Sequence, residues 1–181
     1  MLAISPHFVE SKLAGGRIED MIDVFEDQML GWLVEPAKMM GRSQHSGFAM
    51  LAVTLAYFEP LGQFLEGKAG SSEAQFTLGM KAVFPAMAAA DPRLFKELYN
   101  QLRCGMFHRG ITKGKVRVVR GTMYQFSFQG STEDVEQINV DPWRLLTAVE
   151  LHIREYVGQL RSGTDENLRQ NFVKWFSLRA A

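Results

Sequence analysis

The sequence predicts an all-α fold, an up-and-down bundle of about five to six helices, with a small β-hairpin inserted between the fourth and fifth helices. Two observations lead to this prediction. Apolar residues recur at three- and four-residue steps along most of the chain, which is the period of an amphipathic α-helix. Alternation of apolar and polar residues, typical of strands, is confined to residues 113–140. Strands are therefore too sparse for a parallel sheet with crossover helices.

The N-terminal part is expected to form a loosely held arm followed by the first helix. Pro6 and Gly15–Gly16 punctuate residues 1–16, which show no helical period. From Arg17 onward apolar residues recur at helical spacing, and acidic residues crowd the first turns, where the helix dipole favours them. Pro36 is expected to kink or end this helix, because its ring clashes with the preceding turn.

The second helix is expected to be the central, buried element. It should begin at Ser43 or Ser46 and run to about Gly67. Its apolar residues are dense around the whole helix, which is typical of an element enclosed by others. Pro60 lies within it and should bend it.

The third and fourth helices are limited by capping residues and prolines. The third should begin at Ser71, Ser72 and Glu73 and be interrupted by Pro85. The fourth should begin at Asp91, which can cap free backbone donors, with Pro92 at the first helical position. It should end at Gly110, since glycine is a usual helix stop. Its apolar stripe consists of Leu94, Phe95, Leu98, Leu102 and Met106.

Residues 113–140 are expected to form the inserted hairpin. Two alternating segments, 115–120 and 123–129, flank Gly121–Thr122, which fits a two-residue turn with glycine first. The aromatic residues of the second segment share one face, which must pack on the bundle or on a second protomer, because an isolated hairpin is marginally stable. A short third strand can follow at 138–140.

Two helices are expected to complete a single domain over residues 1–181. Asp141–Pro142 repeats the start signal of the fourth helix and opens the fifth, which should run to about Arg161. Thr164 and the acids after it should start the sixth helix. We find no internal repeat at a solenoid period.

Composition restricts the function classes. Lys plus Arg is 20 and Asp plus Glu is 20, so the neutral chain is not a bulk nucleic-acid binder, and any RNA contact must come from a local patch. One cysteine excludes an intramolecular disulfide and indicates a reducing compartment. We see neither a secretory signal nor a membrane-spanning run, and we expect a cytoplasmic protein. The histidines form no HExxH pair and no phosphate loop is present, so no metal or cofactor is expected.

Arg103 and His108 are the candidate catalytic residues, because both lie off the apolar stripe of the fourth helix. In an ideal helix five residues separate them by roughly 140°. The long arginine side chain, or a break at Gly105, would have to bring the two head groups together. In the structural alternative, Arg103 forms a salt bridge with Glu97 or with an acid on another helix, and His108 caps the helix end.

The stretch from Arg103 to His108 resembles the arginine-histidine signature of the HEPN superfamily, in which four to six residues separate the two. The family's up-and-down bundle with variable insertions is similar to the order of elements expected here. Members with the motif are typically metal-independent endoribonucleases and often dimers. The resemblance therefore implies RNA as substrate and, for toxin or defence members, an antitoxin or regulatory partner. The position after the arginine is usually polar in active members, and here it is Cys104.

Metal-free RNA cleavage needs a base, an acid and a cation for the charge that develops on phosphorus. His108 can perform either proton transfer, and Arg103 can bind phosphate oxygens. One chain supplies one motif histidine, so a homodimer joined through the motif helix would supply two. Tyr99 or Asn100 can orient the phosphate or ribose. Glu59, on the second helix, either faces solvent or pairs with Arg103 or orients His108.

A basic stretch follows the motif. Arg109 and Lys113 begin it, and it continues to Arg120 without an acid. Together with the strand aromatics it can form an RNA-contacting face, with phosphates on the cations and bases on the rings. In the plainer interpretation the aromatics belong to the core and the cations solvate an exposed hairpin.

Three functions stay open on the sequence alone. The first is a metal-independent endoribonuclease. The second is a non-catalytic HEPN-like module that dimerises or binds a partner or a nucleotide, which Cys104 favours. The third is a helical small-molecule-binding protein, whose sign would be an apolar pocket away from His108. A thiolate activated by His108 is a further use of Cys104, although a lone helical cysteine is more often a packed residue.

Overall fold

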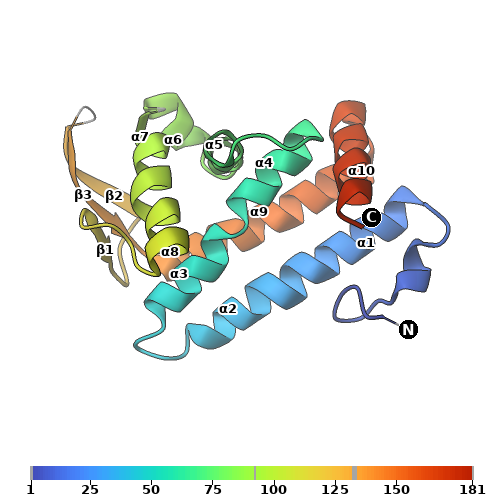
Figure 1. Cartoon of the computed structure of the whole chain (residues 1–181), viewed down its shortest axis with the longest axis horizontal. Helices are drawn as coiled ribbons and strands as arrows, with labels where there is room; N and C mark the ends of the chain where they lie inside the picture. Colours follow the sequence, from blue (N-terminus) through green and yellow to red (C-terminus); the bar gives the residue numbers. More distant parts are fainter. Residues whose placement is uncertain (1, 92, 132–133, 181) are drawn as a thin grey trace.

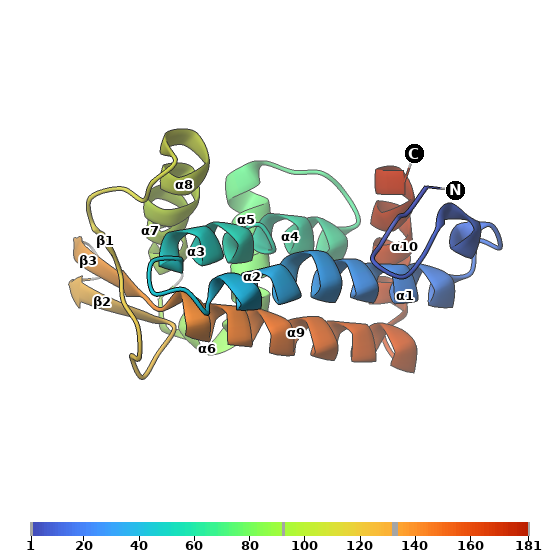
Figure 2. The same ribbon diagram turned by 90° about the horizontal axis from the view of Figure 1, so that it is seen from below.

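The computed structural model describes residues 2–91, 93–131 and 134–180, and it confirms a mostly helical chain with one small sheet (Figure 1). Figure 2 shows the rod of α1 and α2, the pair α3–α4 and helix α9 lying alongside one another, with the sheet at one end and α10 at the other. The helices are α1 (Ile18–Gln28), α2 (Glu35–Met40), α3 (Gly47–Leu55), α4 (Phe58–Glu66), α5 (Ser72–Val83), α6 (Pro85–Ala90), α7 (Arg93–Leu98), α8 (Cys104–Arg109), α9 (Pro142–Ser162) and α10 (Glu166–Ala180). The strands are β1 (Val116–Val118), β2 (Phe126–Gly130) and β3 (Val135–Val140).

The first predicted helix continues through Pro36 instead of ending there. Helix α1, a π-helical turn at Met29–Val34 and helix α2 form one rod that reaches Met40 (Figure 1). Proline lacks the N–H that would bond to the preceding turn, and its ring crowds that turn. The wider π-helical turn directly before Pro36 relieves both effects.

The N-terminal arm packs against this rod, so the expectation of a loosely held arm is wrong. The side-chain amide of Gln28 donates to the carbonyl oxygen of Ile4 at 2.6 Å. The backbone N–H of His7 donates to Asp27 at 2.8 Å, and its ring Nδ1 lies 2.7 Å from the same carboxylate. The Pro6 ring occupies the space beside Gly31 that any larger residue there would fill.

The predicted bend at Pro60 is confirmed. The chain leaves the α-helical conformation at Ala56–Tyr57 and resumes it at Phe58, which separates α3 from α4. The break falls where the proline ring would meet the carbonyl group of the residue four positions earlier. The stretch Gly47–Glu66 has the length and hydropathy of a membrane span, but 50% of it is buried inside the protein. This burial is typical of a central core helix.

Two glycines let helices α4 and α5 touch backbone to backbone. A Cβ atom on Gly79 would lie 2.0 Å from the carbonyl oxygen of Phe58, and one on Gly62 would lie 2.1 Å from that of Gln75. Figures 1 and 2 show α5 running across α4. Ser71 caps α5 by accepting from the N–H of Ala74, and helix α6 follows after the predicted interruption at Pro85.

The sheet has a different pairing from the predicted hairpin. Strands β1 and β2 do not pair with each other; β3 lies between them, parallel to β1 and antiparallel to β2. Strand β3 takes the centre because Val135, Ile138 and Val140 are buried. Asp141 accepts from the N–H groups of Gly121 and Thr122, at 2.8 and 3.1 Å, so these residues anchor a longer connection instead of forming a tight turn.

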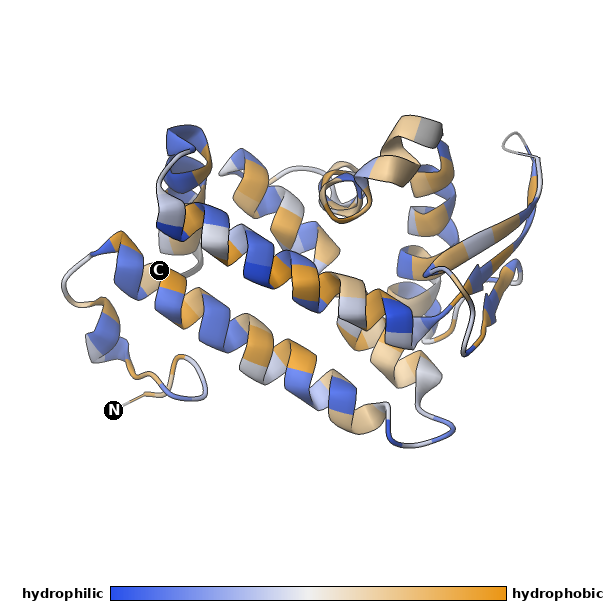
Figure 3. Cartoon of the chain, turned by 180° about the vertical axis from the view of Figure 1, so that it is seen from behind, coloured by the Kyte–Doolittle hydropathy of each residue, from blue (hydrophilic) through white to orange (hydrophobic). Residues whose placement is uncertain are grey.

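Two groups of buried side chains form the core. The larger joins α3, α5, α7 and the sheet to α9, and it includes Phe126 of the predicted aromatic face. Phe128 is half-buried, whereas Tyr124 is 63% exposed, so only part of that face is core. The smaller group joins α1, α9 and α10 around Phe25 and Phe172. Figure 3 shows hydrophilic and hydrophobic residues side by side along the α1–α2 rod and α9, as expected for helices with one buried face.

Candidate functional site

The predicted motif helix is confirmed as one continuous helix made of α7, a π-helical turn at Tyr99–Arg103, and α8. Asp91 caps it by accepting from the N–H of Arg93 at 2.9 Å, and Gly110 ends it in the left-handed conformation, with φ of 71°. Pro92 lies outside the described residues. The predicted stripe is buried except for the half-buried Met106.

The π-helical turn explains how this stripe stays in line. Leu94, Leu98, Leu102 and Met106 are four residues apart, and in a regular α-helix such positions drift by about 40° at each step. In the turn the N–H of Cys104 bonds to the carbonyl oxygen of Tyr99, five residues back, and the wider turn offsets the drift. Such insertions often occur at functional sites, and this one ends at Arg103.

Arg103 is held by acceptors from two other helices. Its Nε and Nη2 atoms donate to Oε2 of Glu59 on α4, at 3.2 and 2.8 Å. Nη2 also donates to the hydroxyl of Ser72 on α5 at 3.0 Å, and that hydroxyl donates to Glu59 Oε1 at 2.5 Å. The side chains of Arg103 and Glu59 are 18% and 26% exposed, so this ion pair is largely shielded from water. The crossing of α4 and α5 therefore fixes the guanidinium group.

The head groups of Arg103 and His108 meet, as the predicted site requires. Nη1 of Arg103 lies 3.3 Å from Nε2 of His108. Arginine can only donate, so Nε2 accepts and the proton of the neutral imidazole lies on Nδ1. His108 is exposed, whereas the arginine is not. The arginine side chain spans the angular separation, and the helix does not break at Gly105.

Aromatic rings flank the guanidinium. Its Cζ atom lies 5.7 Å from the centre of the Tyr99 ring and 5.3 Å from that of Phe107. Burial raises the pKa of the Tyr99 hydroxyl, which keeps it a neutral donor. A shallow hollow of about 220 Å³ opens beside Glu59, Arg103 and Phe107. Phe107 is 50% exposed and offers a ring face next to this hollow.

The other predicted site residues are not all brought together. Within the part of the chain that the structure describes, the side chains of Asn100, Arg109 and Lys113 make no hydrogen bond or ion pair, and none of them lines the hollow. Lys113 contributes its backbone, whose N–H donates to Gln101 at 3.0 Å. Glu97, the alternative partner of Arg103, accepts instead from the side chain of Gln101 at 3.5 Å.

The sequence interpretation missed two residues of this site. Ser72 was expected only as part of a helix start, but Ser71 provides the cap and leaves the Ser72 hydroxyl for Arg103 and Glu59. Phe107 lies off the apolar stripe, and that offset is the signal that could have marked it as a surface ring.

His152, on α9, is half-buried and contacts two tyrosines. Its Nδ1 lies 2.9 Å from the hydroxyl of Tyr57, and its ring stacks on Tyr156. Burial lowers the pKa of His152 to about 4, so the ring is neutral at physiological pH. His108 is thus the exposed histidine with a cationic partner, whereas His152 is half-buried against two tyrosines.

No metal site accompanies these residues. Among residues 2–91, 93–131 and 134–180, no three His, Cys, Asp or Glu side chains are placed to hold a metal ion together. Cys104 is a free thiol. Comparison of the chain with protein-family models, with curated proteins and with solved structures finds no significant match.

Proposed function

We propose that the chain is a HEPN-like, metal-independent endoribonuclease of the cytoplasm that cleaves single-stranded RNA, of the toxin or defence type. The observation that carries the proposal is the contact between Arg103 and His108, with the arginine fixed by Glu59 and Ser72 and the histidine open to solvent. A fixed cation beside an accessible proton acceptor is what attack on a phosphodiester requires.

The hydrogen bonds of Arg103 decide how it can bind a phosphate. Glu59 and Ser72 occupy Nε and Nη2, so only Nη1 remains for a phosphate oxygen. An unpaired arginine could instead bind a phosphate in a bidentate way. Nη1 carries two N–H donors, of which one contacts His108 and the other is free for a phosphate oxygen. A phosphate bound there would lie next to Nε2 of His108.

The reaction then proceeds in one displacement. Nε2 of His108 takes the proton of the ribose 2′-hydroxyl, and that oxygen attacks phosphorus. The bond from phosphorus to the 5′-oxygen of the next nucleotide breaks, and this oxygen takes a proton. The products are a 2′,3′-cyclic phosphate and a free 5′-hydroxyl. Charge on the phosphoryl oxygens is stabilised by Arg103.

A homodimer would supply the proton donor. One chain carries one motif histidine, and His108 of a second copy can protonate the leaving oxygen. Large apolar side chains are exposed at the end of the motif helix, where Phe107 and Ile111 are 50% and 55% exposed. Burying them between two copies would place the motif helices next to each other. An antitoxin or regulatory protein could cover the same surface.

The decisive assay is cleavage of single-stranded RNA in EDTA. Wild type should produce fragments that end in a cyclic phosphate, and His108→Ala should lower the rate at least about a hundredfold, the effect of losing a general base. His7→Ala is the matched control, because His7 is exposed and remote in sequence from the motif. Equal inactivity of wild type and His108→Ala on diverse RNA would overturn the nuclease proposal.

The second candidate is a non-catalytic HEPN-like module that dimerises or binds a partner. The occupied Nε and Nη2 edge of Arg103 favours it, because the best phosphate-binding edge is taken by Glu59. Cys104 at the position after Arg103 favours it as well. In that case Arg103→Ala would lower the melting temperature or the dimer affinity with no activity to lose.

A further inference from the structure

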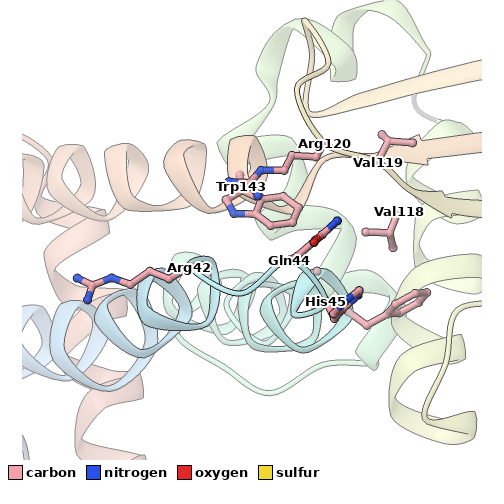
Figure 4. Close-up of a pocket in the computed structure, with 9 residues that line it drawn as sticks. Arg42, Gln44, His45, Val118, Val119, Arg120 and Trp143 are labelled. Carbon is pink, nitrogen blue, oxygen red and sulfur yellow. The ribbon is translucent and has the colours of Figure 1, made fainter.

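A second basic site lies between the α2–α3 connection and strand β1. A pocket of about 670 Å³ opens there, and Arg42, Gln44, His45 and Arg120 contribute its polar lining. Phe48, Val118 and Trp143 contribute apolar surface. Figure 4 shows Arg120 lying across Trp143 and Gln44 extending between Trp143 and Val118, whereas Arg42 lies at the rim with its head group turned outward. The lining contains no acid.

Close packing shapes the floor of this pocket. The indole N–H of Trp143 donates to the carbonyl oxygen of Gly41 at 3.0 Å. A Cβ on Gly41 would lie 3.0 Å from that indole nitrogen, and one on Gly47 would lie 3.0 Å from Val118. The connection between α2 and α3 is therefore seated on Trp143 and β1, which holds Gln44 and His45 opposite Arg120.

The polar residues of this pocket have no anionic partner among the described residues. Across the described residues, neither Arg42, His45 nor Arg120 forms an ion pair or a side-chain hydrogen bond with the protein. Arg120 makes a cation–π contact, with Cζ 4.4 Å from the centre of the Trp143 ring. By contrast Arg103, Arg154 and Arg161 each pair with a carboxylate. Arg120, which lies in this hollow beside His45 and Gln44 and has no anion next to it, leaves an anionic ligand as the missing partner.

We propose that this pocket is a binding site for a phosphate ester. Arg120 and His45 would bind the phosphate oxygens, and the Gln44 amide would donate a further hydrogen bond. Val118 and the Phe48 ring would contact the organic group of the ester. The pocket lies apart from the Arg103 hollow and shares no lining residue with it. The proposal does not depend on nuclease activity.

The test is calorimetric titration of the full chain with uridine monophosphate, uridine and inorganic phosphate. Wild type should bind the monophosphate, and the double variant His45→Gln, Arg120→Gln should bind it at least about tenfold more weakly. Lys174→Gln is the matched control, because this exposed lysine of α10 lies at the other end of the molecule. Titration measures binding and requires no RNA cleavage, so its outcome can be told apart from that of the nuclease assay.

The ester can be part of an RNA strand or a small molecule. Titration with a single-stranded oligonucleotide with 2′-O-methyl ribose, which lacks the attacking hydroxyl, distinguishes the two. If the pocket holds a phosphate of an RNA strand, the double variant loses affinity for this oligonucleotide together with the monophosphate. If it holds a small ester, only the monophosphate is affected. Equal affinity of wild type and the double variant for the monophosphate, equal binding of uridine, or no binding by wild type at about 10 mM would each overturn the proposal.

Discussion

The two ends of the molecule differ in how their charges are arranged. At the end formed by α1, α10 and the arm, two cations are each paired with two acids: Lys12 with Asp20 and Asp23, and Arg161 with Asp23 and Glu26. At the end formed by α8, the sheet and the start of α3, Arg109, Arg120 and Arg42 have no carboxylate partner within the described chain. A chain of zero net charge can thus present one basic end.

Arg103 lies at the basic end but is paired. Its partner Glu59 reaches it only because α4 and α5 cross closely between the two ends. The comparison teaches that the exposed ion pairs at one end contribute little to stability, whereas the shielded pair at the other end both stabilises the fold and fixes the guanidinium group. It also predicts which substitutions change folding, which change the site and which change binding alone.

The largest effect is expected from a substitution that forces α4 and α5 apart at their crossing and changes no charge. Gly79→Ala would place a Cβ 2.0 Å from the carbonyl oxygen of Phe58, so the helices must separate. The free energy of unfolding should fall by about 3 kcal/mol, the upper range for overpacking. Gly158→Ala, in α9 with open space around it, should instead raise stability by about 1 kcal/mol. Urea denaturation of both variants measures the contrast.

Removing one acid should affect the two ends differently. Glu59→Ala leaves Arg103 shielded from water without its carboxylate, and the free energy of unfolding should fall by about 2 kcal/mol. Glu26→Ala should cost less than about 1 kcal/mol, because Arg161 is 48% exposed and retains Asp23. Similar losses in thermal or urea unfolding would contradict the distinction between the ends.

Acid should destabilise the fold through His152, a half-buried residue of α9. Burial lowers the pKa of His152 to about 4, below its unfolded value of 6.5. The unfolded chain therefore binds this proton first, and stability is retained above pH 6.5 and lost as the pH falls towards 4. Between pH 7 and 5 the loss should be about 2 kcal/mol. His152→Gln should shrink this pH dependence, whereas His45→Gln, at an exposed position without an ion pair among the described residues, should not.

The smallest effect should come from salt. Raising NaCl from about 50 to 200 mM should weaken binding of the 2′-O-methyl oligonucleotide several-fold, because cations at the basic end displace counterions from phosphates. The melting temperature should change little, since exposed ion pairs at the other end contribute little to stability. A large shift of the melting temperature with salt, and none in binding, would reverse the assignment of the two ends.

The sequence was sufficient for the helices because their periods and caps are local signals. The Asp91 cap, the Gly110 stop and the Pro60 bend are confirmed. The pairing of the strands was not predictable from local turns, because burial of β3 and the long-range bonds of Asp141 decide it. The continuation of the first helix through Pro36 was also not predicted, because it depends on a π-helical turn.

The candidate site was predictable only in part. Helical spacing placed Arg103 and His108 off the apolar stripe, and one of the three alternatives for Glu59, pairing with Arg103, is confirmed. The contribution of Ser72 depends on the α4–α5 crossing, and that crossing depends on glycines whose spacing carries no distinctive pattern. The pocket at Arg120 joins segments far apart in the chain, which no local pattern reveals.

The most direct test of the central claim is chemical rescue of His108→Ala by free imidazole. His108 is exposed, so imidazole can occupy its place beside Nη1 of Arg103. If His108 is the base, imidazole should restore cleavage of single-stranded RNA in EDTA to His108→Ala in a concentration-dependent way. It should not restore cleavage to Arg103→Ala, which lacks the phosphate-binding cation. Full activity of His108→Ala without imidazole, or equal rescue of both variants, would contradict the account.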